Sequence, residues 1–131
     1  MLYVRLLWTM VEIHRILSQM VGTYSIIMAA WGLVNFLRRR PPDGNYNGAV
    51  AIAVILFVLE GIVGVVLVIM GLQPARWLHL LYGVTILITI PGIYAFTRGR
   101  NSSRESMFYG LGFLFIWGLT ERAADTALVP Q

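Results

Sequence analysis

No cysteine and no lysine occur in this chain of 131 residues, and histidine occurs only twice. The lack of cysteine excludes disulfides, thiolate metal sites and cysteine nucleophiles. The chain also lacks the GxSxG, HExxH and P-loop patterns, and no cluster of His, Cys and Asp has metal-ligand spacing. Most enzymes that leave a short sequence signature are therefore excluded, and we expect the chain not to be an enzyme.

Charged residues are also scarce. They make up 12% of the sequence, against 58% hydrophobic residues, and the mean hydropathy is +0.74. A soluble domain of this length is far less apolar, so the composition indicates an integral membrane protein. The net charge of +4 comes from arginines that lie between apolar runs. Because they form no basic face with interleaved aromatics, we expect no nucleic-acid partner.

Four long uncharged stretches predict four membrane crossings. They cover residues 16–37, 44–75, 77–97 and 106–120, with Glu60 as the one interruption of the second. A spanning helix needs about 20 residues, so the fourth must extend to about residue 125. The sequence predicts one all-α domain over residues 1–131, an up-down bundle with helices at about 13–38, 47–71, 74–97 and 103–125.

Local signals set these predicted boundaries. The segment "RRRPPDGN" ends the first helix, Pro74 suits the first turn of the third, and "SSRE" has the spacing of a capping box before the fourth. Pro91 predicts a kink in the third helix. The lead-in "LYVRLLWTMV" predicts a short N-terminal interfacial segment. Arg5 and Glu12 lie too close together to frame a signal-peptide h-region, so we expect the first helix to stay in the mature chain.

The arginines are distributed unevenly between the two predicted ends of the bundle. The first and third loops carry Arg38, Arg39, Arg40, Arg98, Arg100 and Arg104. The other end carries Arg5, Arg15, Arg76 and Arg122, mixed with Glu12, Glu121 and Asp125. By the positive-inside rule, we expect a multi-pass protein of the plasma (inner) membrane with both termini on the extracytoplasmic side.

The two histidines are candidate iron ligands. His14 stands at the start of the first crossing and His79 at the start of the third. Odd-numbered helices of an up-down bundle run parallel, so both imidazoles are expected at the same membrane boundary. Two neutral imidazoles at similar depth are what a six-coordinate b-type haem requires. The alternative is that both histidines only form hydrogen bonds at the interface or within the bundle.

Other residues near the histidines fit the haem hypothesis. Ser18 and Gly83 lie one helical turn beyond His14 and His79, and both are small enough to leave room for a porphyrin. Arg15, Arg76 and Arg122 lie at the same membrane level, where haem propionates need cationic partners. The ionisable residues at this end form a cofactor rim, a docking surface for a partner, or simply the solvated end of the bundle.

Glu60 is a buried acid in the predicted second crossing, close to the bilayer midplane. An ionised carboxylate there costs at least about 2.5 kcal/mol, so Glu60 must face the bundle interior or carry a proton. Gly61 and Gly64 beside it would let a neighbouring helix approach closely. Glu60 is therefore either a proton-relay or ligand-binding acid, or a protonated group bonded to Ser, Thr or Tyr on another helix.

The second half of the chain resembles uncharacterised four-helix membrane proteins of bacteria. The resemblance covers "LHLLYG" through "RGR" and on to "YGLGFLFIWGL". In size and four-helix plan alone the chain is similar to the DoxX-like proteins, which are associated with membrane redox systems. The small multidrug transporters share a buried Glu, but their acid lies in the first helix. The resemblance implies a fold plan and no activity.

Three functional hypotheses follow. The first is a membrane subunit of an electron-transfer or energy-transducing complex, holding one haem b between His14 and His79 above Glu60. The second is a non-catalytic scaffold or accessory protein that contacts other membrane subunits. The third is a small proton-coupled transporter that uses Glu60, as a homo-oligomer because four helices enclose little volume. Each requires the lipid bilayer as a partner.

Overall fold

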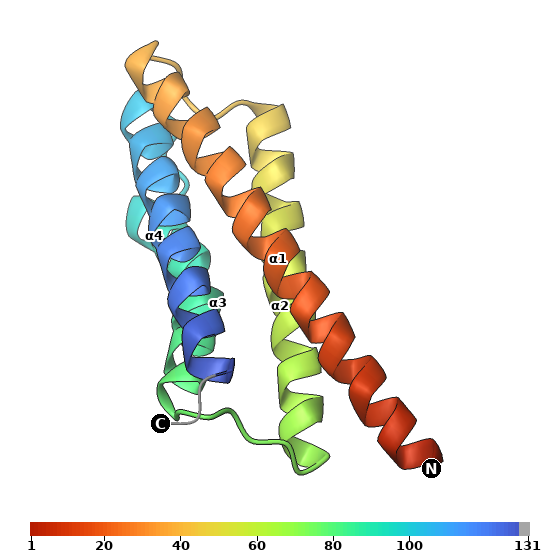
Figure 1. The fold of residues 1–131 in the computed structure, drawn as a ribbon. Helices are drawn as coiled ribbons and strands as arrows, with labels where there is room; N and C mark the ends of the chain where they lie inside the picture. The colour runs from red at the N-terminus through yellow and green to blue at the C-terminus, as the bar shows by residue number, and fades with distance from the viewer. Residues whose placement is uncertain (129–131) are drawn as a thin grey trace.

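The computed structural model describes residues 1–128 and consists of four helices. They are α1 (Leu2–Leu37), α2 (Gly44–Ile69), α3 (Leu78–Thr97) and α4 (Ser103–Leu128). None of residues 1–128 lies in a strand, so the predicted all-α class is confirmed. Successive helices run in opposite directions in Figure 1, with the α2–α3 loop at the same end as the N-terminus.

The four helices form a closed ring of neighbours. Each helix contacts the next along the chain, and α1 also packs against α4, which is the most extensive interface; the α2–α3 interface is the least extensive. Within the described chain, α1 and α3 are not neighbours in this ring, and neither are α2 and α4. Side chains from α1 and α3 therefore meet only across the bundle interior.

Polar groups at the helix ends fix the loops at the arginine-rich end. The side chain of Asp43 accepts a hydrogen bond of 2.8 Å from the backbone N–H of Tyr46 and so caps α2. Before α4, the Ser102 hydroxyl donates to the Glu105 carboxylate at 2.8 Å, and the Glu105 N–H donates to the Ser102 carbonyl at 3.1 Å. The predicted "SSRE" signal thus pairs Ser102 with Glu105 at the start of α4.

Three helices begin at other residues than the sequence predicted, and the starts of α1 and α3 differ most. Residues before Glu12 do not form a separate interfacial segment, because α1 runs unbroken from Leu2 and is about 54 Å long. The Tyr3 hydroxyl donates to the Met70 carbonyl and holds this extension against the end of α2. Pro74 lies in the α2–α3 loop and not in α3. That loop is tied to α4 by a hydrogen bond of 3.2 Å from the Arg76 N–H to the Thr126 carbonyl.

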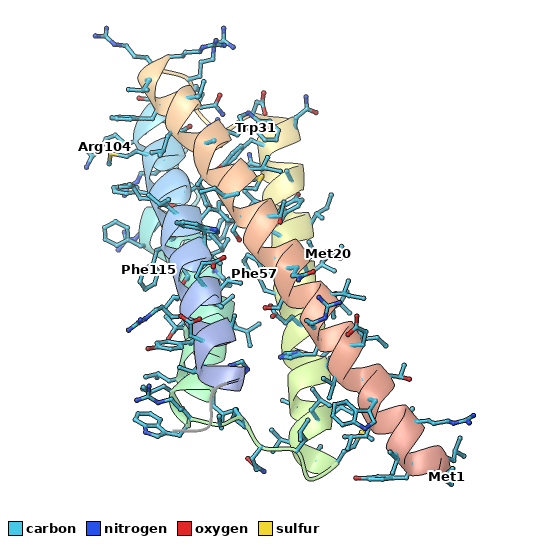
Figure 2. All side chains as sticks on the ribbon, viewed as in Figure 1. Met1, Met20, Trp31, Phe57, Arg104 and Phe115 are labelled. Atoms are coloured by element: carbon cyan, nitrogen blue, oxygen red, sulfur yellow. The ribbon has the colours of Figure 1, made fainter. Side chains whose placement is uncertain are left out.

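The core is a column of aromatic and aliphatic side chains between the helices. It comprises Val21, Met28, Ala29, Tyr46, Ala53, Phe57, Ile86, Ile90, Tyr109, Phe113 and Ile116. Phe57 of α2 meets Phe113 of α4 edge to face, with ring centroids 6.4 Å apart. Figure 2 shows Phe57 between the helices and Phe115 pointing away from them.

Two tyrosine hydroxyls fix the register between α1 and α2. Tyr24 of α1 donates to the carbonyl of Ala49 at 2.7 Å, and Tyr46 of α2 donates to the carbonyl of Met28 at 3.2 Å. Both bonds bury a phenol with its polar end satisfied, as an apolar surrounding requires. The pairing of α1 with α2 is therefore fixed at two points about one turn apart on each helix.

Three of the helices are long and apolar enough to cross a membrane. They are α1, α2 and α3, and by length and composition they support three of the four predicted crossings. Their outward faces carry large exposed apolar side chains such as Ile55, Ile62 and Ile88. By the same measure α4 is not a candidate span; it carries charged residues in its first and last turns and contributes more buried residues than any other helix.

Candidate functional site

The two histidines lie in contact across the bundle. The ring centroids of His14 on α1 and His79 on α3 are 6.1 Å apart, and the ring planes are inclined at 67°. Because α1 and α3 are not neighbours in the ring of helices, this contact lies in the interior and not on one face. Both side chains are half-buried.

A backbone carbonyl on α4 fixes the tautomer of the neutral His79 ring. The Nδ1 atom of His79 lies 2.8 Å from the backbone oxygen of Ala123. A carbonyl oxygen only accepts hydrogen bonds, so Nδ1 carries a proton and donates it to Ala123. In the neutral imidazole, Nε2 then holds the free lone pair. A backbone carbonyl that fixes the tautomer in this way is the usual second partner of a metal-binding histidine.

The His14 ring packs against α2 at Gly64. A Cβ atom added at Gly64 would lie 3.3 Å from Cε1 of His14, tighter than ordinary van der Waals contact. The Nδ1 atom of His14 is buried and makes no hydrogen bond of good geometry within residues 1–128, although the Glu60 backbone lies beside the ring. The Nδ1 atom therefore lies against α2 and is closed to solvent.

Glu60 lies one helical turn from this contact. On antiparallel helices, His14 and Ser18 of α1 face Gly64 and Glu60 of α2, so the Ser18 hydroxyl comes to the Glu60 carboxyl. Glu60 is half-buried. It stands sixteen residues after Gly44 and nine before Ile69, near the middle of α2 and slightly displaced toward the histidine end. The predicted helix, 47–71, began three residues later and ended two residues later than α2, so Glu60 lay one residue from its middle.

The other predicted haem-site residues lie outside this cluster. Arg15, Arg76 and Arg122 are exposed, and Arg15 is paired with Glu12 one turn away on α1. Gly83 is also exposed, and no atom lies within 4 Å of the position that a Cβ would take there. The structure thus brings together four of the predicted residues, namely His14, His79, Ser18 and Glu60.

This cluster offers two protein side chains, His14 and His79, as ligands for a metal ion. Among the described residues no group of three or more His, Cys, Asp and Glu side chains is placed to hold a metal ion. A haem iron needs only two protein ligands, and imidazole nitrogens about 2 Å from one iron have ring centres roughly 6 Å apart. The observed 6.1 Å matches that spacing.

Two surface grooves, beside α1 and α2 and between α3 and α4, are lined by no histidine, so neither is a preformed haem cavity.

One contributor to the site has no signal in the sequence, and a second has only a partial one. The Ala123 carbonyl is a backbone group, and every residue type has one, so the sequence does not indicate that this one contacts His79. Gly64 signals a close helix approach, but its spacing does not tell which helix approaches. The structure shows that Gly64 faces His14 and that Gly61 faces Leu87 of α3.

Fold and site together define an all-α protein with three apolar helices of membrane-spanning length and a contact between two half-buried histidines. Comparison of the chain with protein-family models, curated proteins and solved structures found no match.

Proposed function

We propose that the chain is a multi-pass membrane protein of the plasma (inner) membrane, an up-down bundle in which α4 forms the fourth crossing. The three apolar helices support this proposal, and so do their exposed apolar faces. The polar character of α4 does not argue against it, because α4 packs against both α1 and α3 and exposes less of its surface to lipid. The charged residues of α4 fall in its first turn and its last two turns, near the two proposed membrane boundaries.

Within that bundle, we propose that His14 and His79 bind one b-type haem and that the protein is a subunit of an electron-transfer or energy-transducing complex. The observation that carries this proposal is the 6.1 Å separation of the two imidazole rings. The hydrogen bond from His79 to Ala123 supports it, since it leaves Nε2 free to bind iron. When bound, haem would supply one-electron transfer.

The remaining residues would have supporting roles. Ser18 and Glu60 lie one helical turn from the histidines, toward the middle of the bundle. There the Ser18 hydroxyl would be the hydrogen-bond partner that the half-buried Glu60 carboxyl needs. Arg76 and Arg122 are exposed at the same end and free to reach an anionic edge such as a propionate.

An absorption spectrum of the purified protein tests this function. We expect a Soret band, and a sharp alpha band after reduction, that are lost in His14→Ala and in His79→Ala. Gln19→Ala, an exposed position on the same helix as His14, should keep the full spectrum. Far-UV circular dichroism of each variant shows whether the helices are retained.

A variant that keeps an iron ligand at position 14 separates loss of haem binding from loss of the fold. His14→Met keeps an iron ligand but replaces imidazole by a thioether, which raises the reduction potential of the haem. We expect this variant to hold haem at a more positive potential than the wild type. A protein that remains colourless after haem reconstitution contradicts the haem proposal and leaves the scaffold and transporter hypotheses.

A further inference from the structure

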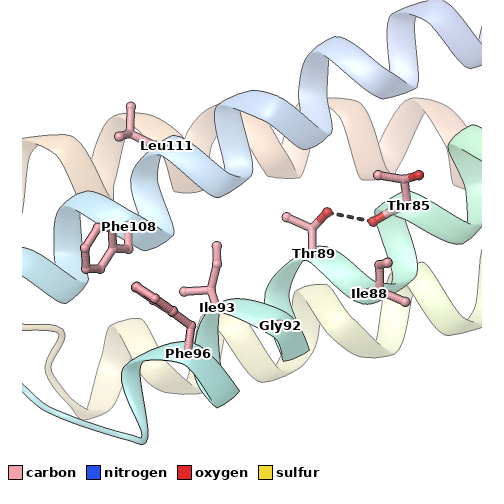
Figure 3. Close-up of a pocket in the computed structure, with 8 residues that line it drawn as sticks. All are labelled: Thr85, Ile88, Thr89, Gly92, Ile93, Phe96, Phe108 and Leu111. Carbon is pink, nitrogen blue, oxygen red and sulfur yellow. Dashed lines mark hydrogen bonds between the residues drawn. The ribbon is translucent and has the colours of Figure 1, made fainter.

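A second feature of the molecule lies at the opposite end from the histidines. An open groove of about 370 Å³ runs between α3 and α4, a volume within the range of roughly 300–1,000 Å³ found for small-molecule sites. Figure 3 shows Phe96 and Phe108 at one end, Thr85 at the other, and Gly92 between them. The two phenylalanine rings meet edge to face with centroids 5.8 Å apart.

The groove presents an apolar surface along its length. Its two hydroxyl groups are already used, because Thr85 donates to the Leu81 carbonyl at 2.8 Å and Thr89 donates to the Thr85 carbonyl at 2.6 Å. From Thr85 to Phe96 is eleven residues of α3, or about 16 Å. That length is about half of a hydrocarbon core roughly 30 Å thick. The groove therefore matches one acyl chain of a single leaflet.

Two exposed arginines, Arg100 and Arg104, lie close in sequence to the phenylalanine end of the groove. Arg104 and Phe108 are separated by four residues of α4 and lie on one face of it. Arg104 is exposed, has no ion-pair partner among the described residues, and extends from the bundle in Figure 2. Arg100 lies in the loop that follows the end of α3 at Thr97; its side chain is 64% exposed and forms an ion pair with Glu105 at 3.9 Å. Both guanidinium groups keep donors free for an anion.

We propose that this groove binds an anionic phospholipid, with an acyl chain between α3 and α4 and the phosphate held by Arg100 and Arg104. Guanidinium groups bind phosphate oxygens in a bidentate manner. Basic pockets between membrane helices at the cytoplasmic side recognise anionic headgroups. The whole end of the bundle carries six arginines against Asp43 and Glu105, so its charge complements an anionic headgroup and not a zwitterionic one.

Native mass spectrometry of the detergent-solubilised full chain tests this site. The probes are phosphatidylglycerol and phosphatidylcholine with identical acyl chains. We expect one tightly bound phosphatidylglycerol and at least tenfold weaker phosphatidylcholine. Each arginine near an anionic surface contributes roughly fivefold, so Arg100→Gln with Arg104→Gln should weaken phosphatidylglycerol binding about 30-fold. Arg38→Gln with Arg39→Gln, at the same end but outside the groove, is the charge-matched control and should change it by less than threefold.

The acyl-chain half of the site is tested separately. A Cβ at Gly92 meets no atom within 4 Å, so Gly92→Leu fills the groove without a clash inside the protein. We expect this variant to weaken binding of both lipids at least tenfold, whereas Gly48→Leu, an equally open position on α2, leaves it unchanged.

Four results would overturn the proposal. They are equal affinity for the two lipids, an equal loss in the control arginine pair, unchanged lipid binding in Gly92→Leu, and binding of inorganic phosphate as tight as that of the lipid. A Gly92→Leu variant that dissociates a dimer while keeping its lipid would assign the groove to a second copy of the chain instead.

Discussion

Two buried serines of the bundle differ in whether their hydroxyl groups have a partner. Ser25 of α1 and Ser106 of α4 are both 0% exposed. Ser106 donates to the Arg40 carbonyl at 2.7 Å and so ties the first loop to α4. The Ser25 hydroxyl makes no hydrogen bond within the described residues. An unpaired buried hydroxyl opposes folding, whereas a paired one is close to neutral or stabilising.

Replacing each serine by alanine should therefore have opposite effects. We expect Ser25→Ala to raise the free energy of unfolding by about 1 kcal/mol, because it removes an unsatisfied polar group. Ser106→Ala should lower it by about 1 kcal/mol, because the Arg40 carbonyl loses its donor. Thermal unfolding in detergent, followed by far-UV circular dichroism, measures both. Equal destabilisation by the two variants would show that Ser25 has a partner in the membrane.

The histidine contact shows how far single residues could be read from the sequence. The shared depth of His14 and His79 follows from the parallel direction of odd-numbered helices, and the structure places them side by side. The sequence does not specify that α1 and α3 occupy opposite corners of the ring, which is what makes the contact internal. It also does not specify which helix covers Gly64, because glycine spacing signals close approach without naming the partner.

Between elements, the closest approach joins α1 and α4. A Cβ at Gly32 would lie 2.9 Å from the Cα of Gly110, and a Cβ at Gly110 would lie 2.9 Å from the backbone nitrogen of Leu33. Real Cβ atoms do not approach backbone atoms so closely, so the two helices touch backbone to backbone at these glycines. Small residues at such crossings drive helix association where lipid supplies no hydrophobic force.

Adding a single methyl group at this crossing should separate the two helices. We expect Gly110→Ala to lower the free energy of unfolding by about 1–3 kcal/mol, since backbone atoms cannot move aside as a flexible side chain would. Gly48→Ala is the matched control, because its Cβ meets nothing within 4 Å. It should be neutral or stabilise α2 by up to about 1 kcal/mol. Detergent unfolding compares the two, and an unchanged Gly110→Ala protein would contradict the tight α1–α4 contact.

Helix number and most helix ends could be predicted from hydropathy and capping residues, but the starts of α1 and α3 could not. The lead-in before Glu12 is apolar with one arginine, a pattern shared by an interfacial helix and by an extension of a spanning helix. In the structure this segment is an extension of α1, and the hydrogen bond from Tyr3 to the Met70 carbonyl holds it against α2. Pro74 suits a first helical turn and a loop equally, and the bond from Arg76 to Thr126 holds it in the loop.

For the whole molecule, charge separates the two ends of the bundle. The end that holds the α1–α2 and α3–α4 loops carries six arginines and two acidic residues. At the other end Arg15 is paired with Glu12, and Arg122 follows Glu121 on α4. The bundle therefore has one strongly basic end and one mixed end. This asymmetry favours a cytoplasmic location for the basic end, where anionic lipids and the insertion machinery retain positive loops.

The complete absence of cysteine makes this orientation directly measurable, since any introduced cysteine is the only thiol in the chain. Asn101 lies in the loop between α3 and α4, Gln73 lies in the loop between α2 and α3, and both are exposed. In intact cells, a membrane-impermeant maleimide should label Gln73→Cys and leave Asn101→Cys unlabelled until the membrane is permeabilised. The opposite pattern would place the basic loops outside.

A third reporter decides whether α4 crosses the bilayer. Asp125 is exposed near the end of α4, at the same end of the bundle as Gln73. If α4 spans, Asp125→Cys is labelled in intact cells together with Gln73→Cys. If only α1, α2 and α3 span, α4 stays on the cytoplasmic side and Asp125→Cys behaves like Asn101→Cys. The extensive packing of α4 against α1 over most of its length makes the first outcome the expected one, because α1 itself is long and apolar enough to cross.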